Sequence, residues 1–458
     1  MPTITTINPA TEETIQTYDL MTLTEATDRL DACHAAFLKW RKLSHQDRVP
    51  YLTNIAQKLR DNADELAALM TRETGKLLKD GHRETETCAA ILDYTAKNGP
   101  AALADEDRIH GANGKRGIVS YQPQGVIYSI QPWNFPLYQP VRVLAANLMT
   151  GNGCILKHSS ICTGSGLRLR ELCIEAGLPK DLFQVIVIDH DVSDKLIAHP
   201  HIRGVTLTGS EAAGRHVGAA AAKALKKTVL ELGSNDAYLV LEDADIETAV
   251  KYSVMGRIYN NGQTCVSAKR FIVTDKVYDA FVDAFVAQMK GITMGDPTDQ
   301  NNQLGPLSSQ DQFAKVKGQV DDSVAKGATI LCGGVAPDRK GAYYPATVLA
   351  DLAPGMPAYD DEIFGPVASV IHARDDEDAM RLANESRYGL GGGIFSKDEA
   401  RALTLARDHF DTGMIRINSF GAADPNMPFG GVKDSGYGRE HGGFGMKEFV
   451  NVKAIFLP

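Results

Sequence analysis

Short apolar stretches alternate with amphipathic ones between residues 126 and 208, and this alternation limits the possible folds more than any other feature of the sequence. It predicts strands at 126–130, 154–157, 183–188 and 204–208. It predicts helices between and after them, at 141–148, 164–176, 192–198 and directly after residue 208. Such a β-α-β order indicates a parallel, doubly wound sheet, which binds ligands at the carboxyl ends of its strands. The predicted fold class is therefore α/β.

The rest of the chain extends this plan in both directions. At 458 residues the chain is too long for one compact core, so we expect two or three domains. A second α/β unit begins near Ser234 and continues to about Pro428, with a strand at 267–274 and a helix at 277–289. The first hundred residues are typical of a short strand followed by long helices. The most clearly periodic helices there are 23–38 and 46–71.

Two further segments are predicted to form β structure. Residues 111–126 are punctuated by Gly, Asn and Lys-Arg and are typical of an extended hairpin. The C-terminal segment 449–457, FVNVKAIFL, is an apolar strand whose edge needs a partner. Pairing with another subunit is one way to cover that edge.

Charge and cysteine content narrow the class of partner. The net charge is −9 and no basic patch interleaved with aromatic residues occurs, which argues against nucleic acid or an anionic membrane as a partner. We find neither an apolar N-terminal signal segment nor an uninterrupted apolar run of about 18 residues. The seven cysteines are scattered without a CxxC pair, and the 12 histidines form no HxxxH motif. We therefore expect a reducing, cytoplasmic location and no metal site.

Cys265 is the candidate nucleophile. A helix predicted at 246–259 has apolar residues at i, i+4 spacing, and Asn261-Gly262 is typical of a left-handed helix stop. Cys265 therefore follows the negative end of a helix dipole, which does not favour a thiolate as a helix N-terminus would. Any activation of this thiol must come from another part of the chain.

A phosphate site is predicted after the strand at 204–208. Gly209 and Gly214 let the turn approach a phosphate, and the helix N-terminal amides with the Ser210 hydroxyl would hold a pyrophosphate. The pattern is not GxGxxG, and a role of Ser210 as a helix N-cap explains it equally well.

The loop at 132–136, PWNFP, suits a second role in acyl chemistry. Its two prolines make the loop rigid, and a rigid loop would aim the Asn134 amide in one direction, as an oxyanion donor requires. The alternative is an Asx-type turn in which Trp133 and Phe135 are core residues.

Glu231 places one carboxylate inside an apolar strand that ends at Gly233. It either pairs with a cation or has the raised pKa that suits a general base.

Two glycine-containing loops follow much later, EIFGP at 362–366 and PFGGVKDSGYGRE at 428–440. Taken singly, each is no more than a loop.

Together these segments occur in one order over roughly 300 residues, and they resemble the aldehyde dehydrogenase superfamily. The matching motifs are PWNFP, GS with a glycine at the fourth position after Ser210, ELG, NGQTC, EIFGP and PFGGxKxSGxGRE. The resemblance implies a Rossmann-like, doubly wound cofactor domain at 1–104, 124–233 and 435–447. It also implies an α/β catalytic domain at 234–434 and a small β oligomerisation domain at 105–123 and 448–458.

The resemblance further implies NAD(P)-dependent oxidation of an aldehyde to a carboxylic acid. Cys265 would form a thiohemiacetal whose oxyanion is held by Asn134 and the Cys265 backbone N–H. Hydride would pass to the nicotinamide, and Glu231 would activate the water that hydrolyses the thioester. The bound nicotinamide is cationic, so the cofactor would favour the thiolate. The implied cofactor-binding residues are Trp133, Lys157, Ser160, Gly209, Ser210, Gly214, Leu232, Glu362 and Phe364.

Three positions depart from the family pattern. Ser234 stands where many members have a second glycine, a change at a turn that we expect to be tolerated. Ser267 stands where some succinate-semialdehyde enzymes have a second cysteine, so that regulatory disulfide cannot form. Ser160 stands where NAD-preferring members commonly have a glutamate. Because a serine can donate a hydrogen bond to a 2′-phosphate that a carboxylate would repel, we expect NADP to be accepted and preferred over NAD.

The substrate is predicted from residues that would line the tunnel to Cys265, namely Tyr138, Arg142, Tyr259 and Ser419. Arg142 stands where succinate-semialdehyde dehydrogenases of the family have an arginine that binds the distal carboxylate; alternatively, it is a structural residue paired with a carboxylate. The second arginine of that clamp is Tyr259 here, and Asp424 would disfavour an anion if it points inward. We expect oxidation of succinate semialdehyde or a similar small polar aldehyde.

Other functions remain open. A broad-range dehydrogenase for glycolaldehyde or lactaldehyde is the enzymatic alternative, and a non-catalytic structural member of the fold and a thiol-dependent ester hydrolase are further ones. A CoA-acylating enzyme is disfavoured because Glu231 is retained as a base for water. The expected partner is a small aldehyde, and the expected assembly is a homodimer or homotetramer.

Overall fold

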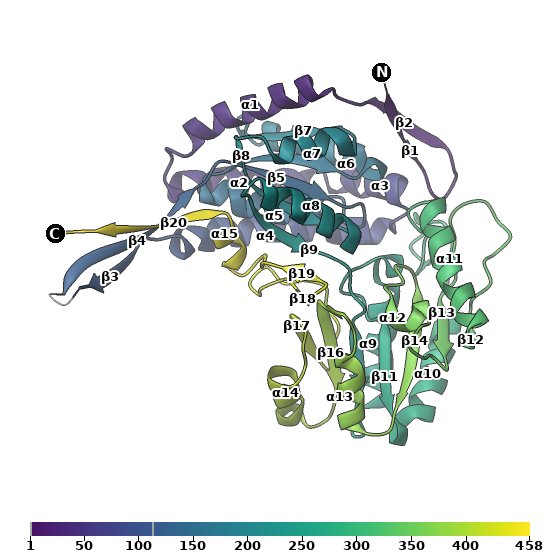
Figure 1. Ribbon diagram of the computed structural model, residues 1–458. Helices are drawn as coiled ribbons and strands as arrows, with labels where there is room; N and C mark the ends of the chain where they lie inside the picture. Colours follow the sequence, from purple (N-terminus) through teal and green to yellow (C-terminus); the bar gives the residue numbers. More distant parts are fainter. Residues whose placement is uncertain (1, 112–113) are drawn as a thin grey trace.

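A computed structural model describes residues 2–111 and 114–458 of the chain (Figure 1). Its strands form a six-stranded sheet in the order β19-β9-β8-β5-β6-β7, in which all strands but β19 are parallel. The chain runs outward from β5 through β6 and β7 and then returns to β8 on the other side of β5. This order confirms the predicted doubly wound sheet and puts its switch point between β5 and β8. The strands are β5 (Val126–Gln131), β6 (Gly153–His158), β7 (Phe183–Ile186), β8 (Ile202–Thr208), β9 (Lys227–Glu231) and β19 (Gly436–Tyr437).

The helices that connect these strands begin and end at residues suited to those places. They are α5 (Tyr138–Thr150), α6 (Thr163–Glu175), α7 (His190–Ile197) and α8 (Glu211–Lys223). α5 is longer than predicted because Pro140, in its first turn, needs no hydrogen-bond partner for its nitrogen there. α5 ends at the left-handed Gly151, and the Ser210 hydroxyl caps α8 by accepting from the amide of Ala213 at 3.3 Å.

The N-terminal segment forms a strand pair and four helices, β1 (Thr3–Ile7), β2 (Thr14–Asp19), α1 (Leu23–Trp40), α2 (His45–Asp61), α3 (Ala63–Thr74) and α4 (Leu78–Ala102). The prediction of one helix over 46–71 is wrong, because Asn62 has non-helical dihedrals (φ −114°, ψ 21°) and separates α2 from α3. Its side-chain amide donates to the carbonyl of Lys58 at 2.8 Å, a local contact that competes with continuation of the helix.

A seven-stranded sheet forms the second α/β unit, in the order β12-β13-β14-β11-β10-β16-β17 with only β12 antiparallel. Its strands are β10 (Ala237–Val240), β11 (Arg270–Thr274), β12 (Thr329–Cys332), β13 (Thr347–Ala350), β14 (Val367–Ala373), β16 (Gly391–Phe395) and β17 (Met414–Ile417). Its helices are α9 (Ile246–Ile258), α10 (Tyr278–Lys290), α11 (Gln310–Ala325), α12 (Pro357–Asp360), α13 (Asp376–Asn384) and α14 (Glu399–Asp408). Short elements complete the fold, β15 (Tyr388–Gly389), β18 (Val432–Lys433) and α15 (Phe444–Glu448).

A three-stranded antiparallel sheet projects from the body of the molecule (Figure 1). It contains β3 (Glu106–His110), β4 (Lys115–Pro123) and β20 (Val450–Phe456). A hairpin is present, but it pairs β3 with β4 over 106–123 rather than 111–126; residues 112–113 lie outside the described part of the chain. The partner of β20 on one side is β4 of the same chain, while Val452 and Phe456 remain exposed. Within the described residues, no helix is both long and apolar enough to cross a lipid bilayer.

Candidate active site

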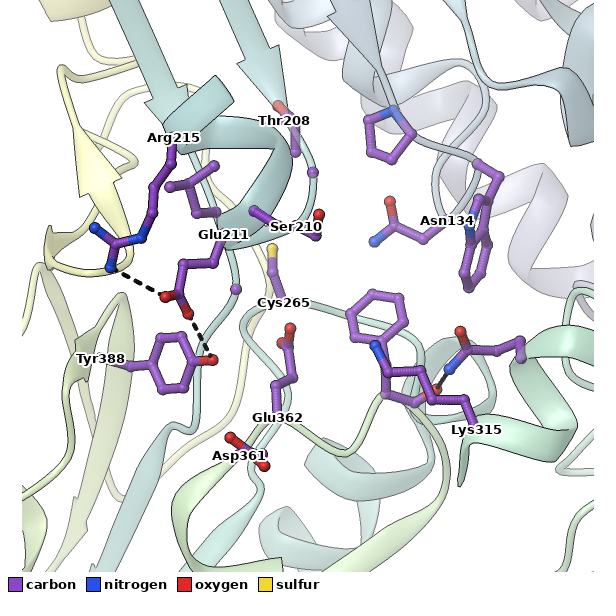
Figure 2. Close-up of a pocket in the computed structure, with 18 of the residues that line it drawn as sticks. Asn134, Thr208, Ser210, Glu211, Arg215, Cys265, Lys315, Asp361, Glu362 and Tyr388 are labelled. Atoms are coloured by element: carbon purple, nitrogen blue, oxygen red, sulfur yellow. Dashed lines mark hydrogen bonds and ion pairs between the residues drawn. The ribbon is translucent and has the colours of Figure 1, made fainter. Parts of the chain in front are cut away.

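A cavity of about 600 Å³ opens at the switch point of the six-stranded sheet, where the loops after β5 and β8 face the second α/β unit. The predicted residues that line it are Trp133, Asn134, Gly209, Ser210, Leu232, Cys265, Glu362 and Phe364. Figure 2 shows Asn134, Cys265 and Glu362 around the same opening. Residues that the sequence separates by more than two hundred positions therefore meet at the place where a doubly wound sheet binds its ligand.

Cys265 is held by the helix stop that its sequence predicts. α9 ends at Ile258, and Asn260, Asn261 and Gly262 follow with left-handed φ angles of 53°, 57° and 73°. A side chain at residue 262 would lie 2.4 Å from the backbone of Gly365, so the close approach of the EIFGP loop requires glycine there. The Asn260 side-chain amide donates to the carbonyl of Asn134 at 2.8 Å. The same turn thus connects the cysteine to both flanking loops.

Burial and nearby carboxylates disfavour the thiolate form of Cys265, whereas two nearby cations favour it. Burial raises the pKa of its thiol to about 12, and the positive charges of Lys269 and Arg142 lower it from what burial alone would give. Two carboxylates, Glu362 and Glu231, act in the opposite direction. Because Cys265 follows the negative end of a helix dipole, side-chain cations are the groups in the protein that favour its thiolate. Of these cations, Lys269 was not predicted from the sequence.

Asn134 has the fixed amide that an oxyanion donor needs. Its Nδ2 donates to the carbonyl of Gln263 at 3.1 Å, which leaves the second amide hydrogen free, and its own carbonyl accepts from the Lys76 ammonium at 3.0 Å. Lys76 is itself buried and paired with Glu84 at 3.0 Å. This arrangement fits a rigid donor better than the alternative of an Asx-type turn.

Glu231, the last residue of β9, is buried and is not among the residues that line the cavity. Neither of its carboxylate oxygens has a hydrogen-bond partner among the described residues. Burial and the neighbouring Glu440 raise its pKa well above the ordinary value, while Arg142 and Arg439 act against this rise. A side chain at Gly430 would lie 2.9 Å from Glu231 Oε1, so the glycine of PFGG makes room for the carboxylate. Among the described residues Glu231 therefore has no ion-pair partner, and of the two alternatives its surroundings fit the raised pKa.

The cofactor-side predictions divide into two groups. The rings of Trp133 and Phe364 meet edge to face at 5.6 Å, and Gly209 and Ser210 face the same cavity, with Ser210 also serving as the N-cap of α8. The remaining three do not line this cavity. Gly214 packs against Leu232, and Lys157 and Ser160 lie at the carboxyl end of β6, the neighbour of β5.

Several lining residues escaped prediction. Gln312, Lys315 and Gln319 reach the cavity from α11, and the amides of Gln312 and Gln319 hold the carbonyls of Phe364 and Glu362 at 2.8 and 3.0 Å. Their i, i+3, i+7 spacing on one helix face was the signal available in the sequence. On the opposite rim, Glu211 pairs with Arg215 and Arg387, as Figure 2 shows for Arg215. The i, i+4 spacing of Glu211 and Arg215 on α8 was a signal available in the sequence, whereas no sequence pattern connects either residue to Arg387.

A second cavity of about 330 Å³ reaches Cys265 from another side and forms a tunnel. Tyr138 and Tyr259 line it, as predicted, together with several further aromatic side chains. Arg83 also lines it, with a side chain that is 65% exposed and paired with Asp80 at 2.9 Å, and the buried carboxylate of Glu84 is a second charged group in the lining. Cys265 therefore lies where the two cavities meet.

The prediction that Arg142 lines this tunnel is wrong. Its side chain is fully buried, forms an ion pair with Glu440, and donates to the hydroxyl of Thr208 at 2.8 Å. The guanidinium lies against the rings of Tyr138 and Phe429, at 5.3 and 4.9 Å, and those two rings line the tunnel. Arg142 is instead a structural residue paired with a carboxylate, which was the alternative interpretation of the sequence.

Ser419 is also displaced from its predicted place. Its hydroxyl donates to the carbonyl of Ile417 at 3.1 Å, and the following residues, from Phe420 to Ala423, line the tunnel instead. Asp424 lines a neighbouring cavity and not the tunnel. After the end of β17, the ring of Phe420 rather than the hydroxyl of Ser419 therefore reaches the tunnel.

Comparison with known proteins agrees with this geometry over the full chain. Residues 2–455 match the aldehyde dehydrogenase family. The chain is 41% identical to a succinate-semialdehyde dehydrogenase [NADP(+)] of Mycobacterium leprae, over 99% of both chains. It is 42% identical to the enzyme of the same name from Mycolicibacterium paratuberculosis, over 99% of this chain and 96% of the relative.

Solved structures give the same result. Succinic semialdehyde dehydrogenase from Streptococcus pyogenes, in complex with NADP⁺, superposes with a TM-score of 0.96 at 40% identity, covering 99% of this chain and 100% of that one. Betaine aldehyde dehydrogenase from Staphylococcus aureus, in complex with NAD⁺, has a TM-score of 0.95 at 31% identity, covering 99% and 91%.

Proposed function

The chain belongs to the aldehyde dehydrogenase family, and from this premise we propose that it oxidises succinate semialdehyde to succinate with NADP as the preferred acceptor. The observation that carries the proposal is the position of Cys265, at the junction of a cofactor-sized cavity and a tunnel with one guanidinium among its lining groups. The names of the full-length relatives support the same substrate and cofactor.

The residues around the first cavity fit the nicotinamide end of the cofactor. Trp133 and Phe364 offer aromatic surfaces, and Glu362 offers a carboxylate to ribose hydroxyls. The N-terminus of α8 lies beside Gly209 and Ser210, where a pyrophosphate is favoured. Lys157, near the end of the neighbouring strand β6, and Ser160, just after that strand, would contact the adenosine half. A nicotinamide bound there would supply the acceptor for the hydride of the tetrahedral adduct.

The protein's own groups perform the remaining steps of the proposed reaction. The Cys265 sulfur attacks the aldehyde carbon, and the oxyanion lies between the free Asn134 amide hydrogen and the Cys265 backbone N–H. After hydride loss the acyl group is a thioester on the sulfur. Glu231 then takes a proton from water, whose oxygen attacks the acyl carbon and releases the thiolate. Glu231 must turn from Gly430 toward Cys265 for this step.

Arg83 is the proposed partner of the distal carboxylate, because it lines the tunnel and is exposed although it is paired with Asp80, whereas Arg142 is fully buried against Glu440 and does not line the tunnel. We expect Arg83→Met to lower kcat/KM for succinate semialdehyde about tenfold and to leave that for butanal unchanged, since an exposed charge pair is partly screened. Lys97→Met is the matched control, because Lys97 lies on the same helix but does not line the tunnel. Steady-state kinetics with both aldehydes measure this. An equal effect on butanal, or wild-type kinetics for succinate semialdehyde, would contradict the proposal and favour a broad-range short-chain aldehyde dehydrogenase.

Ser160 is the proposed determinant of the preference for NADP. It begins a short 3₁₀ turn after β6 and is exposed, so a longer side chain fits there. We expect Ser160→Glu to lower the ratio of kcat/KM for NADP to kcat/KM for NAD by about tenfold or more, so that NAD becomes the preferred cofactor. The reason is that the carboxylate would repel the negatively charged 2′-phosphate of NADP. Ser160→Gln, with the same shape but no charge, should reduce the preference without reversing it. A wild-type enzyme that favours NAD would refute the assignment.

We also propose that the six-stranded, seven-stranded and three-stranded sheets belong to three domains with different functions. The segments 1–104, 124–233 and 435–447 would bind the cofactor, 234–434 would carry Cys265, and 105–123 with 448–458 would mediate self-association. The exposed Val452 and Phe456 on β20 favour a homodimer or homotetramer, which light scattering would measure. The seven cysteines are all free, in keeping with a cytoplasmic location.

A further inference from the structure

Lys269 lies four residues after Cys265 and directly before β11, and its side chain is 3% exposed. Its ammonium group contacts four oxygen atoms. These are the carbonyl of Cys265 at 2.5 Å, the carbonyl of Thr264 at 3.1 Å, the Ser234 hydroxyl at 2.9 Å and Glu362 Oε1 at 3.2 Å. Two of these oxygens are backbone carbonyls at the nucleophile, Thr264 and Cys265, and a third belongs to Glu362, which lines the cofactor cavity. An ammonium has three hydrogens, so this network has no donor to spare.

The partners of Lys269 also contact one another. The Ser234 hydroxyl donates to the carbonyl of Cys265, and the Ser234 amide donates to Glu362 Oε1 at 3.1 Å. The adjacent carbonyls of Thr264 and Cys265 and the EIFGP carboxylate are thus joined through one buried cation. Glu362 Oε2, in contrast, lies beside Gly233 at the cavity wall, where the residue lines the cofactor site.

The contact with Thr264 determines where a catalytic hydrogen points. The carbonyl of Thr264 and the N–H of Cys265 belong to the same peptide unit, and in a planar trans peptide they point in opposite directions. Lys269 holds that carbonyl, so the Cys265 N–H is directed away from Lys269. This N–H has no hydrogen-bond partner among the described residues and is free to meet an oxyanion.

We propose that Lys269 is a positioning residue of the reaction, which orients the Cys265 N–H, supplies the positive charge beside the nucleophile, and holds Glu362 for the cofactor ribose. Ser234 takes part in the same network, since its hydroxyl contacts both the ammonium and the Cys265 carbonyl. The inference rests on the proposed reaction at Cys265, but not on the identity of the aldehyde.

The test is Lys269→Met, which keeps an unbranched side chain one atom shorter than lysine and removes the charge and the hydrogen-bond donors. The first readout is alkylation of Cys265 by iodoacetamide across pH, without cofactor or aldehyde, with Cys265→Ala as the blank for the other cysteines. Lys269 is the cation with the largest lowering effect on the pKa of this thiol, so its loss should shift the alkylation profile to higher pH. At pH 8 we expect a rate about tenfold lower, which corresponds to a shift of about one pH unit. Alkylation needs no substrate, so this readout remains valid even if succinate semialdehyde is not oxidised.

The second readout separates positioning from folding. We expect kcat per titrated active site to fall and KM for NADP to rise, with KM for the aldehyde unchanged. A structural role would lower the yield of folded protein but leave these values and the alkylation profile as in the wild type. If Lys269→Met does not fold, Lys269→Gln, which keeps N–H donors without the charge, serves for the same two readouts. A wild-type profile in whichever variant folds, or failure of both to fold, would overturn the proposal.

Discussion

A Glu231→Gln variant is expected to lose about 10²–10⁴-fold in steady-state aldehyde oxidation and still complete one rapid turnover. Glutamine has the shape of glutamate but cannot accept a proton from water. The steps that precede hydrolysis use Cys265 and Asn134, so reduced cofactor should form once per active site before the reaction stalls at the thioester. Stopped-flow absorbance of the reduced cofactor, followed by mass spectrometry of the acylated protein, measures both stages.

The pH dependence of the same step follows from the surroundings of Glu231. Burial and Glu440 raise its pKa well above the ordinary value, and the base must be deprotonated to act. Hydrolysis by the wild-type enzyme should therefore increase as pH rises through that pKa, and the Glu231→Gln variant should lack this increase. Cys265→Ala, the control, should show no burst at any pH. A missing burst in Glu231→Gln would instead mean that Glu231 acts earlier, on the thiol.

The parts of the structure that could be predicted are those whose cause is local in sequence. Strand and helix periods predict the parallel strands of the doubly wound sheet, but not the two-residue antiparallel strand β19 at its edge, which lies in a segment predicted only as a loop. Asn134 and Cys265 each follow a recognisable break, a proline-bounded loop and a left-handed helix stop, so both positions could be assigned in advance. The break at Asn62 was missed, because a polar residue inside a helical pattern gives no strong stop signal.

The parts that could not be predicted depend on contacts between distant segments. Arg142 and Glu440 are almost three hundred residues apart, and only the packing of the PFGG loop on α5 brings them together. Ser234 was expected to be a tolerated change at a turn. In the structure it is buried and contacts Lys269 and the Cys265 carbonyl, and this role depends on the direction of a side chain that no spacing rule gives.

An Arg142→Met variant is expected to lose about 3–5 kcal/mol of folding stability, the cost of leaving one member of a buried ion pair alone. Both charges are buried, and removal of the guanidinium leaves the Glu440 carboxyl without its ion-pair partner and removes a positive charge that lowers the pKa of both Glu440 and Glu231. Urea denaturation followed by tryptophan fluorescence measures the loss. It should appear as a lower midpoint without a change in slope.

The double variant Arg142→Met/Glu440→Met provides the control that separates the pair from its packing. Replacing both members of a buried pair by apolar side chains is often close to neutral, so the double variant should recover most of the stability that the single variant loses. The two rings that cover the guanidinium, Tyr138 and Phe429, would then pack against methionine and preserve the tunnel wall. The opposite pattern, an Arg142→Met protein as stable as the wild type with a raised KM for succinate semialdehyde, would show that Arg142 turns into the tunnel during turnover and binds the substrate.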